Sequence, residues 1–169
     1  LVDGAVIRDP RAVVAADSEL SVRRQRFVSR GGEKLTAALD EWSISPEGMV
    51  WLDAGASTGG FTDALLKGGA RAVHAVDVGY NQLDYRLRSD PRVHVHERTN
   101  INDVTSLEPA PEAAVCDLSF RSLRGVLVHI LELTAQGWGV ALLKPQFEAA
   151  AEIRWGRRSK KGLDNGILD

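Results

Sequence analysis

Three ionisable residues that lie far apart in the sequence could act on one substrate group: Lys34, Asp117 and Lys144. Lys144 directly follows the apolar residues 140–143, so we expect it to be partly removed from water. Burial and a neighbouring cation both favour a neutral amine, whereas a carboxylate beside it would oppose both effects and hold the amine or ammonium in place. Such an amine can take the proton of an alcohol while the alcohol attacks a sulfonium methyl group in line. A ribose 2′-hydroxyl is a natural acceptor for this chemistry.

A glycine-containing turn at residues 53–61, Asp-Ala-Gly-Ala-Ser-Thr-Gly-Gly-Phe, could bind part of a ligand. Gly55 permits a tight turn, and residues 57–59 bring small side chains and free N–H groups to the start of a helix. Asp77 follows about 20 residues later, at the end of the next apolar run, where an acid typically binds both hydroxyls of a ribose. The pattern predicts a nucleoside pocket.

The glycine spacing indicates which nucleoside-containing ligand the pocket would bind. Ser57 stands where the dinucleotide motif G-x-G-x-x-G has its second glycine, and the sequence has no P-loop motif. The order Asp-x-Gly-x-Ser-x-Gly-Gly instead resembles the first motif of S-adenosylmethionine-dependent methyltransferases. The resemblance implies that the opening acid, Asp53, lies near the methionine part of the cofactor. The alternative is that Gly55, Gly59 and Gly60 only form a tight turn.

Apolar periodicity predicts strands that alternate with helices. The expected strands are residues 49–53, 72–77, 93–97, 113–117 and 139–143. The expected helices are residues 32–42, a segment through Phe61, Leu65 and Leu66, residues 81–88 and a segment through 123–131. This alternation predicts an α/β class fold, a doubly wound, mostly parallel and Rossmann-like sheet. Such sheets bind ligands outside the carboxyl ends of their strands. Strands here are expected to end at or next to Asp53, Asp77, Asp117 and Lys144.

The composition excludes several classes of protein. The 169 residues are 44% hydrophobic and 26% charged with a net charge of −2, so neither general disorder nor coating of nucleic acid by bulk charge is expected. The single cysteine, Cys116, excludes an intrachain disulfide and fits a reducing compartment such as the cytoplasm. No run approaches the roughly 20 apolar residues of a membrane helix, so no membrane partner is expected.

The chain divides into two unequal parts. Residues 1–26 combine a turn signal at Asp3-Gly4 with a basic linker, and we expect them to be the end of a small β-containing domain. Residues 27–169 would form the main domain, which we expect to be incomplete at its C-terminal end. Four arginines in and after the linker are either a solvated surface or a contact to an RNA backbone. They are Arg23, Arg24, Arg26 and Arg30.

Four motifs in this order resemble the TlyA family: residues 28–35, Val-Ser-Arg-Gly-Gly-Glu-Lys-Leu; residues 53–61; residues 117–120, Asp-Leu-Ser-Phe; and residues 144–148, Lys-Pro-Gln-Phe-Glu. This family comprises bacterial ribosomal-RNA 2′-O-methyltransferases, often described as haemolysins, with an FtsJ-like catalytic domain. The resemblance implies S-adenosylmethionine as cofactor, ribosomal RNA as partner with cytidine as the target, and a small RNA-binding domain that ends in residues 1–22.

The resemblance also implies roles for individual residues. The family uses a Lys-Asp-Lys-Glu tetrad, and Lys34, Asp117 and Lys144 match its first three members. Lys144 would be the base or orient the hydroxyl, while the other two tune and position it. The glutamate has no counterpart here, because Glu148 belongs to the Lys-Pro-Gln-Phe-Glu motif. The implied cofactor-binding residues are Asp53, Gly55, Ser57, Thr58, Gly59, Gly60, Phe61, Asp77, Val78, Asn102 and Asp117, with Asn100 or Asp103 as alternatives to Asn102.

The histidines and the cysteine invite other interpretations. His94 and His96 lie on one side of an expected strand, but no carboxylate or cysteine is spaced to complete a metal site, so we expect no metal. His74 and His129 are expected to have no companions. Cys116 is expected to be a small buried residue rather than a nucleophile.

Two other functions compete with methyl transfer. The haemolysin description would suggest a membrane-lytic protein, although no long amphipathic stretch with a broad apolar face supports it. The chain could also be a catalytically idle module that binds cofactor and RNA.

Overall fold

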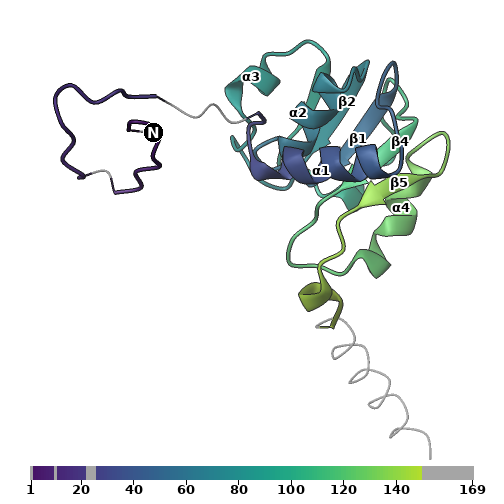
Figure 1. Cartoon of the computed structure of the whole chain (residues 1–169). Helices are drawn as coiled ribbons and strands as arrows, with labels where there is room; N and C mark the ends of the chain where they lie inside the picture. The colour runs from purple at the N-terminus through teal and green to yellow at the C-terminus, as the bar shows by residue number, and fades with distance from the viewer. Residues whose placement is uncertain (1, 10, 22–25, 150–169) are drawn as a thin grey trace, which may run out of the picture.

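The centre of the structure is a five-stranded parallel sheet (Figure 1). This computed structural model describes residues 2–9, 11–21 and 26–149. In spatial order the strands are β3 (Val93–His96), β2 (Ala72–Val76), β1 (Val50–Ala54), β4 (Ala113–Cys116) and β5 (Gly139–Ala141). All four neighbouring pairs are parallel. The chain winds outward from β1 in one direction and then from β4 in the other, so the predicted doubly wound topology is confirmed.

Helices and short 3₁₀ turns connect the strands. The α-helices are α1 (Arg30–Glu41), α2 (Gly60–Lys67), α3 (Tyr85–Arg88) and α4 (Leu127–Glu132). The 3₁₀ turns are η1 (Ile101–Asp103) and η2 (Leu123–Gly125). Ser29 caps α1, since its hydroxyl accepts a hydrogen bond from the N–H of Gly31. The expected helix at 32–42 is therefore confirmed with a start two residues earlier.

Apolar side chains form a separate core on each face of the sheet. Alternate residues of a strand point to opposite faces, so Trp51 packs in one core and Leu52 in the other. The first core joins the sheet to Leu35 of α1 and Leu65 of α2. The second joins it to η1, η2 and α4, where Ile130 is fully buried. Burial on both faces explains why the strands read as continuous apolar runs.

Two predicted helices are shorter in the structure. The segment expected to be helical at 81–88 begins its helix only at Tyr85, because the Asp84 carboxylate accepts from the N–H of Arg86 and caps the helix there. Asn81 before it has a left-handed φ of 56°. The segment through 123–131 divides into η2 and α4 because Val126, with φ −139°, interrupts the helical path. These breaks lie at polar capping residues and glycines, which a prediction from the spacing of apolar residues does not take into account.

The N-terminal segment forms a loop closed by two antiparallel bridges, Val2 with Ala5 and Val2 with Leu20. The first bridge spans the Asp3-Gly4 turn, where both residues have positive φ. The predicted hairpin turn is thus present, with isolated bridges in place of full strands. Arg23 and Arg24 lie outside the described residues.

His74 has companions, contrary to expectation. The parallel register pairs His74 of β2 with His94 of β3, and their rings stack with centroids 4.6 Å apart. His74 Nδ1 lies 3.0 Å from His96 Nε2, and His74 Nε2 lies 2.8 Å from the Pro109 carbonyl oxygen. A carbonyl only accepts, so Nε2 of His74 carries the proton and its Nδ1 accepts from His96. Spacing along a single strand could not reveal this contact across two strands.

Candidate active site

The carboxyl ends of β1 and β4 meet where the winding of the sheet reverses, the usual place for a ligand in this fold. The loop after β1 approaches the loop after β4 closely at Gly55. This glycine has φ +92°, and a Cβ atom there would lie 2.9 Å from the Asp117 carbonyl oxygen and 3.1 Å from Cδ2 of Leu118. The motif therefore needs glycine at this position both for its conformation and for the contact between the two loops.

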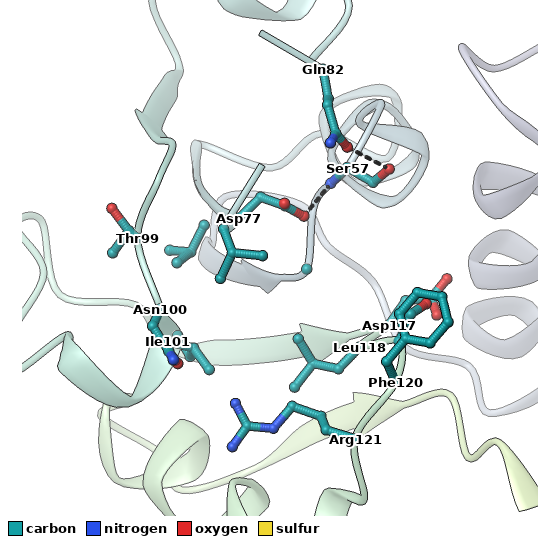
Figure 2. Close-up of a pocket in the computed structure, with 14 residues that line it drawn as sticks. Ser57, Asp77, Gln82, Thr99, Asn100, Ile101, Asp117, Leu118, Phe120 and Arg121 are labelled. Atoms are coloured by element: carbon teal, nitrogen blue, oxygen red, sulfur yellow. Dashed lines mark hydrogen bonds between the residues drawn. The ribbon is translucent and has the colours of Figure 1, made fainter. Parts of the chain in front are cut away.

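A cleft of about 330 Å³ opens beside this contact (Figure 2). Its volume is at the lower end of the range for small-molecule sites. Four loops contribute to it, those that follow β1, β2, β3 and β4. The lining residues are Gly55, Ser57, Val76, Asp77, Val78, Gln82, Thr99, Asn100, Ile101, Asp117, Leu118, Ser119, Phe120 and Arg121.

Asp77 organises one side of the cleft. Its Oδ2 accepts from the N–H of Ser57 at 2.8 Å, and its Oδ1 accepts from the N–H of Gly79 at 2.7 Å. Figure 2 shows the carboxylate turned toward Ser57, whose hydroxyl lies 3.4 Å from Oε1 of Gln82. A carboxylate has about four acceptor positions, and these two bonds leave some of them for a ligand. Asp77 thus ties the glycine turn to β2 and can still accept from hydroxyl groups.

Asp53, the fourth residue of β1, does not line the cleft. Its side chain is fully buried, Oδ2 accepts from the Thr62 hydroxyl at 2.7 Å, and Oδ1 has no hydrogen-bond partner. Burial raises the pKa of Asp53 from 3.8 to about 7, opposed by hydrogen bonds from Thr62 and reinforced by the nearby Asp117 and Asp77 carboxylates. The negative form is costly here, so any cation brought close to Asp53 would be stabilised.

Two of the three residues expected to do chemistry are in contact. Nζ of Lys144 lies 2.5 Å from Oδ1 of Asp117 and donates to the Ser119 hydroxyl at 2.8 Å. Asp117 follows β4 and lines the cleft, while Lys144 follows β5, the neighbouring strand. The side chains are about a quarter exposed, 20% for Lys144 and 27% for Asp117, so the pair is accessible at the edge of the sheet.

Lys34 occupies a different place. It is an exposed residue of α1, and in the described part of the chain no ion pair joins it to Asp117 or Lys144. Its motif has a packing role, because a Cβ at Gly32 would lie 2.9 Å from the Gly60 carbonyl oxygen. The two glycines let α1 lie directly on the start of α2. The convergence of Lys34 on the pair therefore stays a prediction.

The expected cofactor-binding residues separate into two groups. Gly55, Ser57, Asp77, Val78 and Asp117 line the cleft. Thr58, Gly59, Gly60, Phe61 and Asn102 lie outside its lining, as Asp53 does.

Four residues of the second group have a defined place in the surrounding structure. Gly59 is the N-cap of α2 with φ 94°, and the carbonyl of Thr58 accepts from the N–H of Asp84. Phe61 is buried in the core. Asn102 is exposed on η1, and it is the neighbouring Asn100 that lines the cleft.

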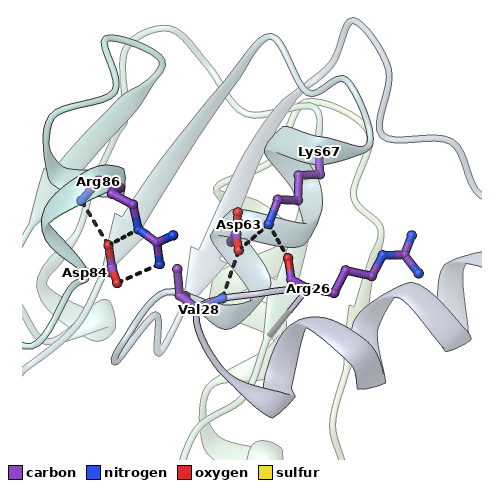
Figure 3. A network of polar contacts seen from close by, with 6 residues as sticks. All are labelled: Arg26, Val28, Asp63, Lys67, Asp84 and Arg86. Carbon is purple, nitrogen blue, oxygen red and sulfur yellow. Dashed lines mark hydrogen bonds and ion pairs between the residues drawn. The ribbon is translucent and has the colours of Figure 1, made fainter. Parts of the chain in front are cut away.

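The described arginines of the linker region lie away from the cleft lining. Figure 3 shows the chain at Arg26 and Val28 held to α2, since Asp63 accepts from the N–H of Val28 and pairs with Lys67, both at 2.9 Å. Lys67 also donates to the Arg26 carbonyl oxygen. The Arg26 guanidinium lies 5.0 Å from the centre of the Phe27 ring. Arg30 is exposed at the first position of α1.

Eight of the lining residues were not assigned to the site from the sequence: Val76, Gln82, Thr99, Ile101, Leu118, Ser119, Phe120 and Arg121. Phe120 is 90% exposed, and Figure 2 shows the Arg121 side chain extending from the same loop, below Leu118 in this view. The Asp-Leu-Ser-Phe motif and the arginine after it are visible in the sequence. A periodic pattern does not say which way loop side chains point, so only Asp117 was assigned to the site.

No helix in the described ranges is long and apolar enough to cross a membrane. The same residues contain no group of three or more histidine, cysteine, aspartate or glutamate side chains that could hold a metal ion.

Curated relatives match most of the chain. It is 48% identical over 132 residues to "Hemolysin A" of Brachyspira hyodysenteriae, covering 76% of this chain and 55% of the relative. It is 43% identical over 153 residues to "16S/23S rRNA (cytidine-2'-O)-methyltransferase TlyA" of Mycobacterium tuberculosis, covering 87% and 57%. The chain thus spans a little over half the length of these relatives.

One solved structure and one protein family also match this chain. The crystal structure of "a putative hemolysin from Lactococcus lactis" superposes with a TM-score of 0.71 at 45% identity, covering 75% of this chain and 62% of that one. The family described as FtsJ-like methyltransferase matches residues 27–158, which include the glycine turn, Asp117 and Lys144. The chain belongs to the FtsJ-like methyltransferase family.

Proposed function

We propose that this protein transfers a methyl group from S-adenosylmethionine to a ribose 2′-hydroxyl of ribosomal RNA, with cytidine as the target nucleoside. The observation that carries the proposal is the contact of Lys144 with Asp117, at 2.5 Å, next to a cleft whose acid, Asp77, suits a ribose. The names of the relatives support RNA as the substrate and cytidine as the nucleoside.

The cleft fits the adenosine part of the cofactor. Asp77 has acceptor positions for two ribose hydroxyls, Val78, Ile101 and Leu118 provide apolar surface, and Asn100 offers an amide for a base edge. Gly55 permits the close approach of the loops after β1 and β4, both of which line the cleft. Asp53, buried behind the glycine turn with an unpartnered oxygen, would stabilise positive charge placed near it. When bound, S-adenosylmethionine supplies an electrophilic methyl group.

The chain's own residues account for handling the proton. Lys144, as the neutral amine, would bind the acceptor hydroxyl and take its proton as the new oxygen–carbon bond forms and the carbon–sulfur bond of the cofactor breaks, and the Asp117 carboxylate would stabilise the ammonium that results. Asp117 and the Ser119 hydroxyl hold the amine in one orientation. Lys34 would be the third residue of this catalytic group, with its side chain directed from α1 toward the substrate. Phe120, largely exposed at the cleft, offers a ring on which an unstacked base could lie.

The chain organisation belongs to the same proposal. We place the catalytic domain from residue 27 onward, in agreement with the start of the family match, and residues 1–26 in the end of an RNA-binding domain plus linker. Arg23, Arg24, Arg26 and Arg30 would contact the RNA backbone there. A ribosomal RNA substrate implies a cytoplasmic site of action.

The proposal is tested by incubating the protein with labelled S-adenosylmethionine and ribosomal RNA. We expect label in RNA and none in an oligonucleotide whose target ribose lacks the 2′-hydroxyl. Methylation at the 2′-oxygen also protects the adjacent phosphodiester bond from alkali. Cofactor binding without transfer would select the idle module instead, and leakage of liposomes at low protein concentration would select the membrane-lytic alternative.

A further inference from the structure

Glu148 makes two hydrogen bonds that the chemistry described above does not use. Its Oε2 accepts from the Ser122 hydroxyl at 2.6 Å, and its Oε1 accepts from the N–H of Leu123 at 2.8 Å. Ser122 is the cap of η2, and Leu123, its first residue, is buried in the second core. Both oxygens of the carboxylate therefore bind the start of η2.

The two segments joined by Glu148 are those that carry the Lys144–Asp117 pair. Lys144 begins the helical turn at residues 145–149, because its carbonyl accepts from the N–H of Phe147 at 2.9 Å and of Glu148 at 3.4 Å. Glu148 is thus one helical turn from Lys144. On the other side, the loop 117–123 runs from Asp117 to the residues that Glu148 binds.

Strand pairing alone does not hold this part of the chain. Within the described residues β5 is a three-residue edge strand that pairs with β4 alone, and the last backbone hydrogen bond between the two segments runs from the N–H of Leu142 to the Cys116 carbonyl. Lys144 lies beyond that bond. The same two segments also meet through the rings of Phe120 and Phe147, whose centres lie 5.5 Å apart. In the sequence these rings lie between the Lys144–Asp117 contact and the bonds of Glu148 to η2. Beyond Leu142, the hydrogen bonds, ion pair and ring contact that join these two segments in the described residues therefore all involve side chains.

The charge on Glu148 suits this role. Hydrogen bonds from Ser122 and Leu123 hold the pKa of the Glu148 carboxyl below its usual range, so it stays ionised at neutral pH. A hydrogen bond to an ionised acceptor is about twice as strong as one between neutral groups. In the described part of the chain the Glu148 carboxylate forms no hydrogen bond or ion pair with the Lys144 side chain, and the two residues are joined through the backbone, where the N–H of Glu148 donates to the Lys144 carbonyl.

We propose that Glu148 is a positioning residue that clamps the loop 117–123 against residues 144–148 and so keeps Lys144 in contact with Asp117 and Ser119. This inference rests on the proposed function for its effect on rate, whereas the clamp itself is a property of the fold. Glu148 is not a substitute for the glutamate of the family tetrad, because both of its oxygens are engaged by η2.

The test compares Glu148→Ala with Glu148→Gln and with Glu132→Ala, an exposed glutamate of α4 used as a control. Glu148→Ala should lower kcat about tenfold to hundredfold, the size expected for loss of a charged hydrogen bond. The KM for S-adenosylmethionine should stay within about twofold. Glu148→Gln should restore most of kcat, because its amide oxygen can accept from Leu123 and its amide nitrogen can donate to Ser122. Glu132→Ala should match the wild type.

Two further measurements need no activity. Amide exchange at Leu123 and the rate at which Lys144 is acetylated, both followed by mass spectrometry, should rise several-fold in Glu148→Ala and in neither other variant. Unchanged exchange and labelling, or a kcat loss that Glu148→Gln does not relieve, would overturn the inference. If the wild type transfers no methyl group, the proposed function fails, and the exchange and labelling results alone decide on the clamp.

Discussion

Nζ of Lys144 lies 2.5 Å from Oδ1 of Asp117, although the two residues follow different strands. The contact exists because β4 and β5 are parallel neighbours, so their carboxyl ends share one edge of the sheet. Asp117 also lines the cleft, and its carbonyl oxygen is so close to the glycine turn that a Cβ atom at Gly55 would lie 2.9 Å from it. A candidate base and a candidate nucleoside site are therefore joined through a single residue.

Loss of the Asp77 carboxylate should weaken cofactor binding. We expect Asp77→Ala to raise the Kd for S-adenosylhomocysteine about tenfold to hundredfold, because two ribose hydroxyls and the bonds to Ser57 and Gly79 are lost together. Calorimetry measures this directly. Asp90→Ala is a matched control, since Asp90 also accepts from a backbone N–H but lies away from the cleft lining. Equal affinities in the two variants would exclude Asp77 from the site.

A methyl group at Gly55 should separate the two loops. Gly55→Ala combines the strain of a positive φ with a contact of 2.9 Å to the Asp117 carbonyl oxygen, whereas Gly48, with φ +73°, has nothing within 4 Å. Gly48→Ala should therefore cost about 1–2 kcal/mol of unfolding free energy from conformation alone. Gly55→Ala should cost at least 1 kcal/mol more and also weaken cofactor binding. Denaturant unfolding of the two variants checks this prediction. Equal losses of unfolding free energy would contradict the close approach of the two loops at Gly55.

The buried Asp53 should make the protein less stable as the pH rises. Its pKa is raised from 3.8 to about 7, so between these values the folded protein keeps a proton that the unfolded chain has lost. The free energy of unfolding contributed by Asp53 therefore falls from about pH 4 to pH 7. Asp53→Asn keeps an acceptor for Thr62 and should raise stability at pH 8 by about 2 kcal/mol. A variant with the wild-type pH dependence would show that Asp53 is ionised at little cost.

His74 should act in the opposite sense. Burial lowers the pKa of His74 from 6.5 to about 4, so in this range the unfolded chain binds a proton that the folded protein refuses. Its contribution to stability is complete above pH 6.5 and is lost as the pH falls toward 4. Protonation would also set two N–H donors against each other at the His96 contact. Unfolding curves of His74→Gln should show less acid destabilisation than the wild type, and greater acid sensitivity would refute this assignment.

The strands and the polar ends of the sheet were predictable for a clear reason. Buried runs such as residues 50–54 and 72–76 are apolar throughout and stop at glycine or aspartate, so their limits in the structure agree to within about a residue. Because parallel strands end at one edge, Asp77, Asp117 and Lys144 could be assigned to that edge before the fold was known.

Side-chain directions in loops and helices could not be predicted in the same way. Phe61 follows the glycine turn but packs in the core, and Asn100 lines the cleft in place of Asn102. Lys34 lies on a helix whose rotation depends on the glycine contact of α1 with α2, a tertiary feature. The bonds of Glu148 to η2 join segments that are distant in sequence, and no local pattern signals them.

The central claim is tested most directly by Lys144→Ala, assayed side by side for methyl transfer to ribosomal RNA and for S-adenosylmethionine binding. Removal of a general base that acts in the transition state should lower the transfer rate by about 10²–10⁴-fold. The Kd for the cofactor should stay close to that of the wild type, because Lys144 is not among the residues that line the cleft. Transfer at the wild-type rate by Lys144→Ala, with the cofactor bound normally, would contradict the account.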